Sequence, residues 1–124
     1  MKAVLKWLIG GALFGNLVLA GDFDEAKKIY ANGDYDKTAK IYKKACDKEH
    51  TKGCVKLGHM YFFGRGVEKD NIKAFKLFEK ACNDGRVTGC HSLAHMYYNG
   101  IGGVERNNIK AFELLEKTYR WMSY

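Results

Sequence analysis

Three residues in the second half of the chain have the types and spacing of a small reactive site. His91, Ser92 and His95 fall within five residues, in a segment whose apolar spacing predicts a helix. Positions i and i+3 of a helix are neighbours, so His95 is placed to act as a base for a Ser92 nucleophile. The competing interpretation is an ordinary helical serine. Ser92 and His95 are therefore the candidate catalytic pair, and the sequence leaves both interpretations open.

The same two histidines are also spaced to hold a metal ion from one face of a helix. His91 and His95 stand at i and i+4, which places both side chains on one side. The helical zinc-protease pattern requires a glutamate directly after the first histidine, and Ser92 occupies that position. No carboxylate follows at a fitting place. We therefore expect no metal site and no other cofactor.

Four cysteines form a second set of reactive residues, and they repeat. Cys46 and Cys54 recur as Cys82 and Cys90 after 36 residues. The seven residues between the members of each pair do not fit a zinc knuckle, and a redox-active pair would be spaced more closely. Four cysteines allow three disulfide connectivities, and repetition favours Cys46–Cys54 with Cys82–Cys90. The cysteines then indicate an oxidising compartment.

The repeat extends to the neighbouring residues and predicts the elements that carry these groups. A fixed period of 36 residues is typical of stacked helix pairs rather than of a globule with one central pocket. Apolar spacing and helix-capping residues predict three helix pairs, over residues 22–47, 51–84 and 87–122. The predicted fold class is therefore all-α, with one domain over residues 21–124.

A stripe of aromatic and histidine side chains follows the first helix of each of the last two pairs. It consists of Val55, His59, Phe62 and the equivalent His91, His95, Tyr98, with Asn99 beside them. In superhelices of helix pairs the first helices line the concave face, so the stripe is a candidate ligand-binding surface. The alternative is that His59 and His95 merely pack between neighbouring helices.

Residues 1–20 have the pattern of a cleavable secretory signal. A basic head with Lys2 and Lys6 precedes an apolar run, and Val18 and Ala20 are small residues before a cleavage point at Gly21. The apolar run is short for a membrane anchor. We therefore expect a secreted or periplasmic protein without stable membrane insertion after cleavage. The remaining chain has a net charge of +5, spread without a dense basic block, so no nucleic-acid partner is expected.

The repeated residues resemble the Sel1-like repeat, a relative of the tetratricopeptide repeat. The first match consists of Leu57-Gly58, Tyr61, Gly64, Gly66-Val67, Asp70, Lys73-Ala74, Phe78 and Lys80-Ala81. The second consists of Leu93-Ala94, Tyr97, Gly100, Gly103-Val104, Asn107, Lys110-Ala111, Leu115 and Lys117. With a cysteine pair in each repeat and a signal segment, the chain is similar to the Helicobacter cysteine-rich proteins. The resemblance implies an exported, right-handed α/α superhelix with one disulfide per repeat.

Two functions follow from these observations. The repeat architecture indicates a module that binds a peptide, a protein segment or a cell-wall fragment on its concave face. The resemblance implies, as the alternative, a weak β-lactamase or penicillin-binding protein. The Ser-x-x-Lys, Ser-Asp-Asn and Lys-Thr-Gly motifs of serine enzymes that act on β-lactams are missing from the sequence. Whether the chain is an enzyme is left open.

The end of the chain departs from the family pattern. Tyr119 stands where the repeat would place the next cysteine, and Trp121, Met122 and Tyr124 follow it. These apolar residues would normally meet another repeat. We therefore expect self-association through this end of the molecule.

Overall fold

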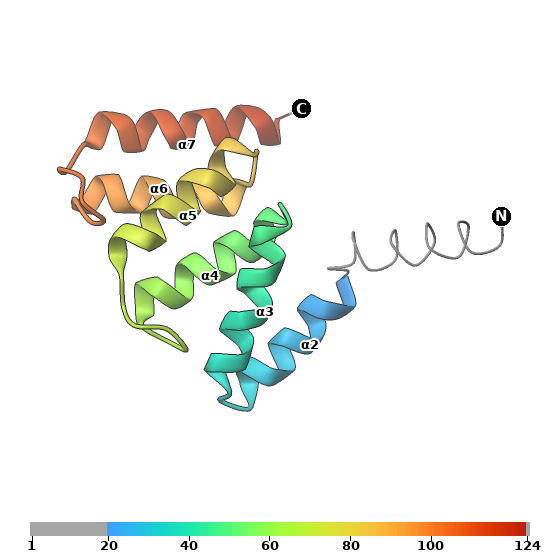
Figure 1. The fold of residues 1–124 in the computed structure, drawn as a ribbon. Helices are drawn as coiled ribbons and strands as arrows, with labels where there is room; N and C mark the ends of the chain where they lie inside the picture. Colours follow the sequence, from blue (N-terminus) through green and yellow to red (C-terminus); the bar gives the residue numbers. More distant parts are fainter. Residues whose placement is uncertain (1–19, 124) are drawn as a thin grey trace, which may run out of the picture.

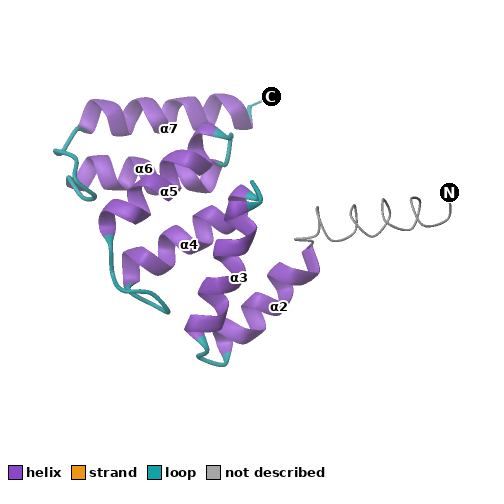
Figure 2. Ribbon diagram, in the orientation of Figure 1, coloured by secondary structure: helices purple, strands orange, loops and turns teal. Residues whose placement is uncertain are grey.

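The computed structural model describes residues 20–123, and within that range the chain is entirely helical with connecting loops (Figures 1 and 2). The helices are α2 (Ala20–Ala31), α3 (Tyr35–Asp47), α4 (Thr51–Phe63), α5 (Asn71–Asn83), α6 (Val87–Asn99) and α7 (Asn108–Met122). They form the three predicted pairs. The predicted signal segment, apart from Ala20, lies outside the described residues. Among the described helices, none combines the length and the hydropathy needed to cross a membrane.

Capping residues explain where several helices begin and end. The Asp70 carboxylate accepts hydrogen bonds from the backbone N–H groups of Ile72 and Lys73, both at 3.0 Å. Asn107 caps α7 in the same way, accepting from the N–H of Lys110 at 2.9 Å. Both side chains satisfy N–H groups that have no partner inside the helix. Gly64 ends α4 in the left-handed conformation that a glycine adopts without steric cost.

The loop after α4 packs on the start of α3, and the loop after α6 packs on the start of α5. In each case this is the second helix of the preceding pair. A Cβ atom on Gly66 would lie 2.2 Å from the carbonyl oxygen of Tyr35, at the start of α3. Gly102 has the equivalent environment, with the carbonyl oxygen of Asn71 at 2.9 Å from such a Cβ. The sequence match had paired Gly66 with Gly103. The contacts instead make Gly102 the equivalent, so Gly103 is the extra residue of the longer loop.

The six described helices form a linear array in which each helix packs mainly on its neighbours in the sequence, α2 on α3 through α6 on α7. In Figure 1, α2 and α7 lie at opposite ends of this array. The buried apolar residues form two clusters, one around Tyr42 and Leu57 and one around Phe78 and Leu93. This arrangement confirms the predicted all-α superhelix of helix pairs.

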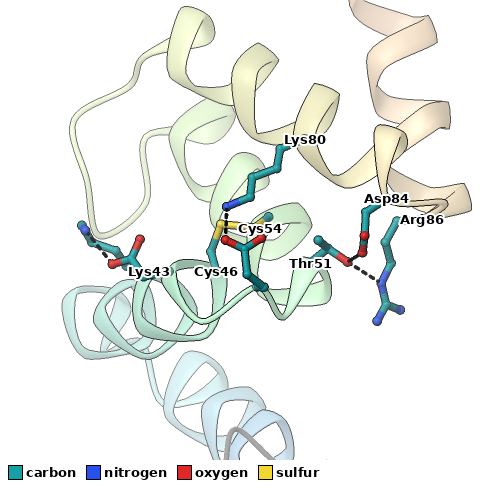
Figure 3. Close-up of a disulfide and its surroundings, with 9 residues drawn as sticks. Lys43, Cys46, Thr51, Cys54, Lys80, Asp84 and Arg86 are labelled. Carbon is teal, nitrogen blue, oxygen red and sulfur yellow. Dashed lines mark hydrogen bonds and ion pairs between the residues drawn. A yellow bond between two sulfur atoms is a disulfide. The ribbon is translucent and has the colours of Figure 1, made fainter. Parts of the chain in front are cut away.

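Each disulfide joins the second helix of one pair to the first helix of the next. The structure contains Cys46–Cys54 and Cys82–Cys90, the connectivity that repetition favoured. Figure 3 shows the first bond beside a polar junction between repeats: the Thr51 hydroxyl donates to the Asp84 carboxylate at 2.9 Å and accepts from Arg86 Nε at 3.3 Å. The bond fixes α4 against α3 of the preceding pair, and the junction fixes it against the turn between α5 and α6.

The face of α7 that points away from α6 is uncovered. Phe112, Tyr119 and Met122 are 66%, 63% and 62% exposed. Phe112 stands at the position of its repeat that is equivalent to Phe75. Phe75 is buried because α6 covers it, through contacts such as the one with the Tyr97 ring at 5.4 Å, whereas no described helix covers Phe112. Self-association through this face stays a prediction.

Candidate functional site

A close approach between α4 and α5 positions the central histidine. A Cβ atom on Gly58 would lie 2.6 Å from Cε1 of Phe78, so only glycine allows the Phe78 ring to lie this close to α4. The ring is 1% exposed and supports His59, whose ring centroid is 5.1 Å away. The backbone thus holds one half-buried imidazole at the surface between two repeats.

A hollow of about 290 Å³ lies between α4 and α6, and it is called the α4–α6 hollow here. It is lined by His59, Phe62, Phe63, Phe78, His91, Ser92, His95 and Met96. Within it, His59 Nε2 and Ser92 Oγ share a hydrogen bond at 3.2 Å. The sequence had paired Ser92 with His95 on the same helix. In the described structure the imidazole bonded to Ser92 comes instead from the preceding repeat.

Only some residues of the predicted binding stripe line this hollow. Phe62, His91 and His95 line it, and the rings of Phe62 and His95 lie 6.1 Å apart. Tyr98 lies outside the hollow, with the Arg106 guanidinium 5.2 Å from its ring centroid. The Asn99 amide donates to the carbonyl of His95 at 2.8 Å, within its own helix.

Val55 was wrongly included in the binding stripe. It is 4% exposed and belongs to the buried cluster that contains residues of α5 and α6. The repeat following α4 covers this flank of the helix. The equivalent His91 on α6 is exposed, so equivalence between repeats does not imply equal access to a ligand.

A second and larger hollow, of about 400 Å³, lies beside the first and is called the α2–α4 hollow. Its lining residues are Lys27, Tyr30, Tyr42, Lys56, His59, Met60, Phe63 and Arg65. His59 and Phe63 line both hollows, so the two lie side by side over α2, α4 and α6, and together they are called the groove here. Sequence reasoning missed most of this hollow. The signal that indicates it is the stripe Lys56, His59, Met60 and Phe63 at i, i+3, i+4 and i+7.

Burial and positive charge change the titration of two groups in the groove. Burial and then the charge of Lys56 lower the pKa of His59 below its ordinary value. Burial, followed by the charges of Lys27 and Lys52, lowers the pKa of Lys56. The His59 imidazole is therefore neutral at pH 7, and Nε2 can accept the hydrogen bond of the Ser92 hydroxyl.

The lowered pKa of His59 predicts a loss of stability in mild acid. The unfolded chain binds a proton at this histidine more readily than the folded chain, so the free energy of unfolding falls as pH drops below the unfolded value of about 6.5. Denaturant titrations at pH 7.5 and pH 5 measure this fall. The fall in unfolding free energy should be smaller in His59→Gln than in the wild type. His91→Gln, which changes an exposed residue of the same hollow, should show the same fall as the wild type. Equal falls in all three proteins would contradict the assignment.

The described residues 20–123 contain no group of three or more His, Cys, Asp or Glu side chains that could hold a metal ion. His91 and His95 face the α4–α6 hollow beside aromatic rings. What the groove offers chemically is one hydrogen-bonded His–Ser pair, an aromatic surface and, in the α2–α4 hollow, three cationic side chains.

Comparison with known proteins places these features in a family. The family model described as "Sel1 repeat" matches residues 26–50, 51–85 and 87–120, which is more than half of the chain. Among curated proteins, HcpC of Helicobacter pylori strain J99, provisionally named as a beta-lactamase, is 37% identical over 74 residues. That alignment covers 56% of this chain and 26% of HcpC, so the chain spans about a quarter of the length of this relative.

Solved structures of similar shape include two of particular use. The crystal structure of c5321, a protective antigen of uropathogenic Escherichia coli with an SLR fold, matches 81% of this chain and 22% of its own length, with a TM-score of 0.72 and 30% identity. Cysteine-rich protein B of Helicobacter pylori (hcpB) matches 96% of this chain and 86% of its own length, with a TM-score of 0.68 and 26% identity.

Proposed function

This chain belongs to the Sel1 repeat family, and from that premise we propose that it is an interaction module that holds a segment of a partner protein in its groove. The observation that carries this proposal is that the two hollows are adjacent and share the lining residues His59 and Phe63. A groove that crosses three first helices fits an extended chain better than a compact small molecule. Aromatic and histidine side chains supply contact area, and aromatic residues dominate the energetics of such interfaces.

The test is selection of peptides on the oxidised protein from a displayed library of random twelve-residue sequences. We expect enriched peptides that lose about tenfold or more in affinity when groove residues are truncated. His59→Ala combined with His95→Ala removes two of the three imidazoles that line the groove. Phe63→Ala changes an exposed residue, so a loss of binding in this variant cannot be attributed to a folding defect of the double variant. Phe112→Ala, which removes an exposed ring far along the chain, is the matched control.

Three outcomes would decide the proposal. Loss of binding in the groove variants with retention in Phe112→Ala would support it. Enriched peptides whose affinity no groove variant changes would move the binding surface elsewhere. Failure to enrich any peptide, together with binding of soluble cell-wall fragments, would favour a cell-wall ligand instead of a protein segment.

We also propose that the protein acts outside the cytoplasm, after cleavage before Gly21. The two disulfides are typical of proteins from oxidising compartments, and the apolar run before Gly21 has the pattern of a secretory signal. Intact-mass measurement on protein from the periplasmic and extracellular fractions tests this. A product that begins at Gly21 supports it, and an uncleaved chain confined to the cytoplasm contradicts it.

A second candidate function is acyl transfer from a β-lactam to Ser92. It is favoured by the His59–Ser92 hydrogen bond and by the provisional name of the relative HcpC. In this scheme Ser92 Oγ attacks the lactam carbonyl while its proton passes to His59 Nε2; the ring C–N bond then breaks and the nitrogen takes that proton. Intact-mass spectrometry after incubation with benzylpenicillin should show an adduct that is lost in Ser92→Ala. If neither an adduct nor hydrolysis of benzylpenicillin were detected, the acyl-transfer function would be excluded and peptide binding would remain as the proposed function.

A further inference from the structure

Three cationic side chains converge on the α2–α4 hollow from different elements. Lys27 comes from α2, Lys56 from α4 and Arg65 from the loop after α4. The lining residues include no carboxylate. The ion pairs of the described chain are Lys43–Asp47, Lys80–Glu49 and Arg120–Glu116, and none of them involves these three cations. The hollow is therefore a concentration of positive charge without an acidic partner in the part of the chain that the structure describes.

The positive charges around this hollow act on one another. The positive charges of Lys27 and Lys52 lie near enough to Lys56 to lower its pKa, after the larger effect of burial. Like charges held together in this way repel one another, and an anion bound among them would relieve the repulsion. The hollow is thus electrostatically prepared for an anion.

Arg65 is oriented by aromatic rings. It donates a hydrogen bond to the Tyr30 hydroxyl, and its guanidinium lies 5.4 Å from the ring centroid of Phe63 and 5.8 Å from that of Tyr35. An oriented guanidinium presents its remaining N–H groups in a fixed direction, which suits recognition of a carboxylate.

The other walls of the hollow are apolar. Tyr30, Tyr42, Met60 and Phe63 supply aromatic and aliphatic surface beside the cations. An inorganic anion would pair with the cations but would leave the apolar surface exposed to water. The shape and lining fit an anion that carries an apolar group next to it.

We propose that the α2–α4 hollow recognises a carboxylate of the bound peptide segment that stands beside an aromatic or large apolar side chain. This inference rests on the proposed function and names the chemistry that the groove selects. A carboxyl terminus and an acidic side chain both supply a carboxylate, and the experiment distinguishes these two sources.

The test uses small probes of fixed composition, followed by chemical-shift changes in the ¹⁵N-labelled, oxidised protein. The probes are N-acetyl-phenylalanine, its carboxamide, N-acetyl-glutamyl-phenylalaninamide and inorganic phosphate. We expect shifts at Lys27, Tyr30, Lys56 and Arg65, and an affinity about tenfold higher for the two carboxylates than for the neutral carboxamide. The preference should shrink as salt is raised to about 0.5 M, because salt screens exposed charges.

Matched variants tie the preference to the hollow. Lys27→Gln combined with Lys56→Gln should abolish the preference for carboxylates while leaving binding of the carboxamide unchanged. Lys76→Gln, which removes an exposed lysine of α5 outside both hollows, should keep the preference. If only N-acetyl-phenylalanine gains affinity, the source is a carboxyl terminus; if only the glutamyl probe does, it is an acidic side chain.

Other results would overturn the proposal. Equal affinities for the carboxylates and the carboxamide, or an unchanged preference in the double lysine variant, would show that the cations do not select the ligand. Phosphate that competes as well as N-acetyl-phenylalanine would show a general anion site. Each of these failures is compatible with peptides enriched by the groove, so the proposed function is tested separately by the displayed library.

Discussion

Phe78→Ala is expected to lower the free energy of unfolding by about 3–5 kcal/mol. The Phe78 ring is 1% exposed, contacts α4 at Gly58 and supports the His59 ring. Truncation would remove the buried ring and leave a cavity among α4, α5 and α6, which the surrounding helices can fill only in part. Since small domains are stable by about 5–15 kcal/mol, this is a large share of the total. Denaturant titration monitored by circular dichroism measures the change.

Phe112→Ala provides the matched control because it deletes the same side chain at an uncovered position. Phe112 is 66% exposed, so its removal should change the unfolding free energy by less than about 1 kcal/mol. If both variants lost similar stability, the Phe78 ring would not be the packing centre that its burial indicates. The comparison also reports whether another molecule covers α7 in solution. If Phe112 were covered, Phe112→Ala would lower the unfolding free energy by more than this.

Removal of both disulfides is expected to be the other large effect. Each bond closes a loop with a sequence separation of eight residues, which the chain-entropy model values at about 2.5 kcal/mol. Replacing all four cysteines by alanine should therefore cost about 5 kcal/mol, a cost that reaches the lower end of typical domain stability. Alanine is suitable because Cys54 and Cys90 are fully buried, at 0% exposure.

The two disulfides can be compared with each other as well as with the intact protein. Because the loops have equal length, the pair variants Cys46→Ala with Cys54→Ala and Cys82→Ala with Cys90→Ala should lose similar amounts of stability. Reduced wild-type protein provides a second measurement without any substitution. Unfolding free energies that agree before and after reduction would contradict a stabilising role for these bonds.

Most of the fold could be predicted because the repeat supplies each signal twice. The helix starts at Asp70 and Asn107 and the helix ends at Gly64 and Gly100 follow from local backbone chemistry, and the structure has them where the sequence indicates. The cysteine pairing likewise follows from a pattern that recurs in each unit. These features depend on residues near one another in the chain.

The site was harder to predict because its contacts cross from one repeat to the next. Ser92 is bonded to His59, 33 residues away, and single-helix spacing cannot reveal such a partner. The cations of the α2–α4 hollow come from two helices and a loop, and the first helix pair does not follow the 36-residue repeat closely enough to mark Lys27. Val55 was misplaced because residues of α5 and α6 cover its flank, whereas the equivalent His91 is exposed in the described part of the chain.

The helix array has a consequence for how the chain acquires its disulfides. Because helices contact mainly their sequence neighbours, the fold has a low contact order, and such chains fold rapidly from local units. Each cysteine meets its native partner across the turn between two adjacent helices, whereas Cys54 and Cys82 are 28 residues apart. Native pairing can therefore precede completion of the chain. We therefore expect the chain to form its native disulfides with little need for an isomerase to reshuffle them.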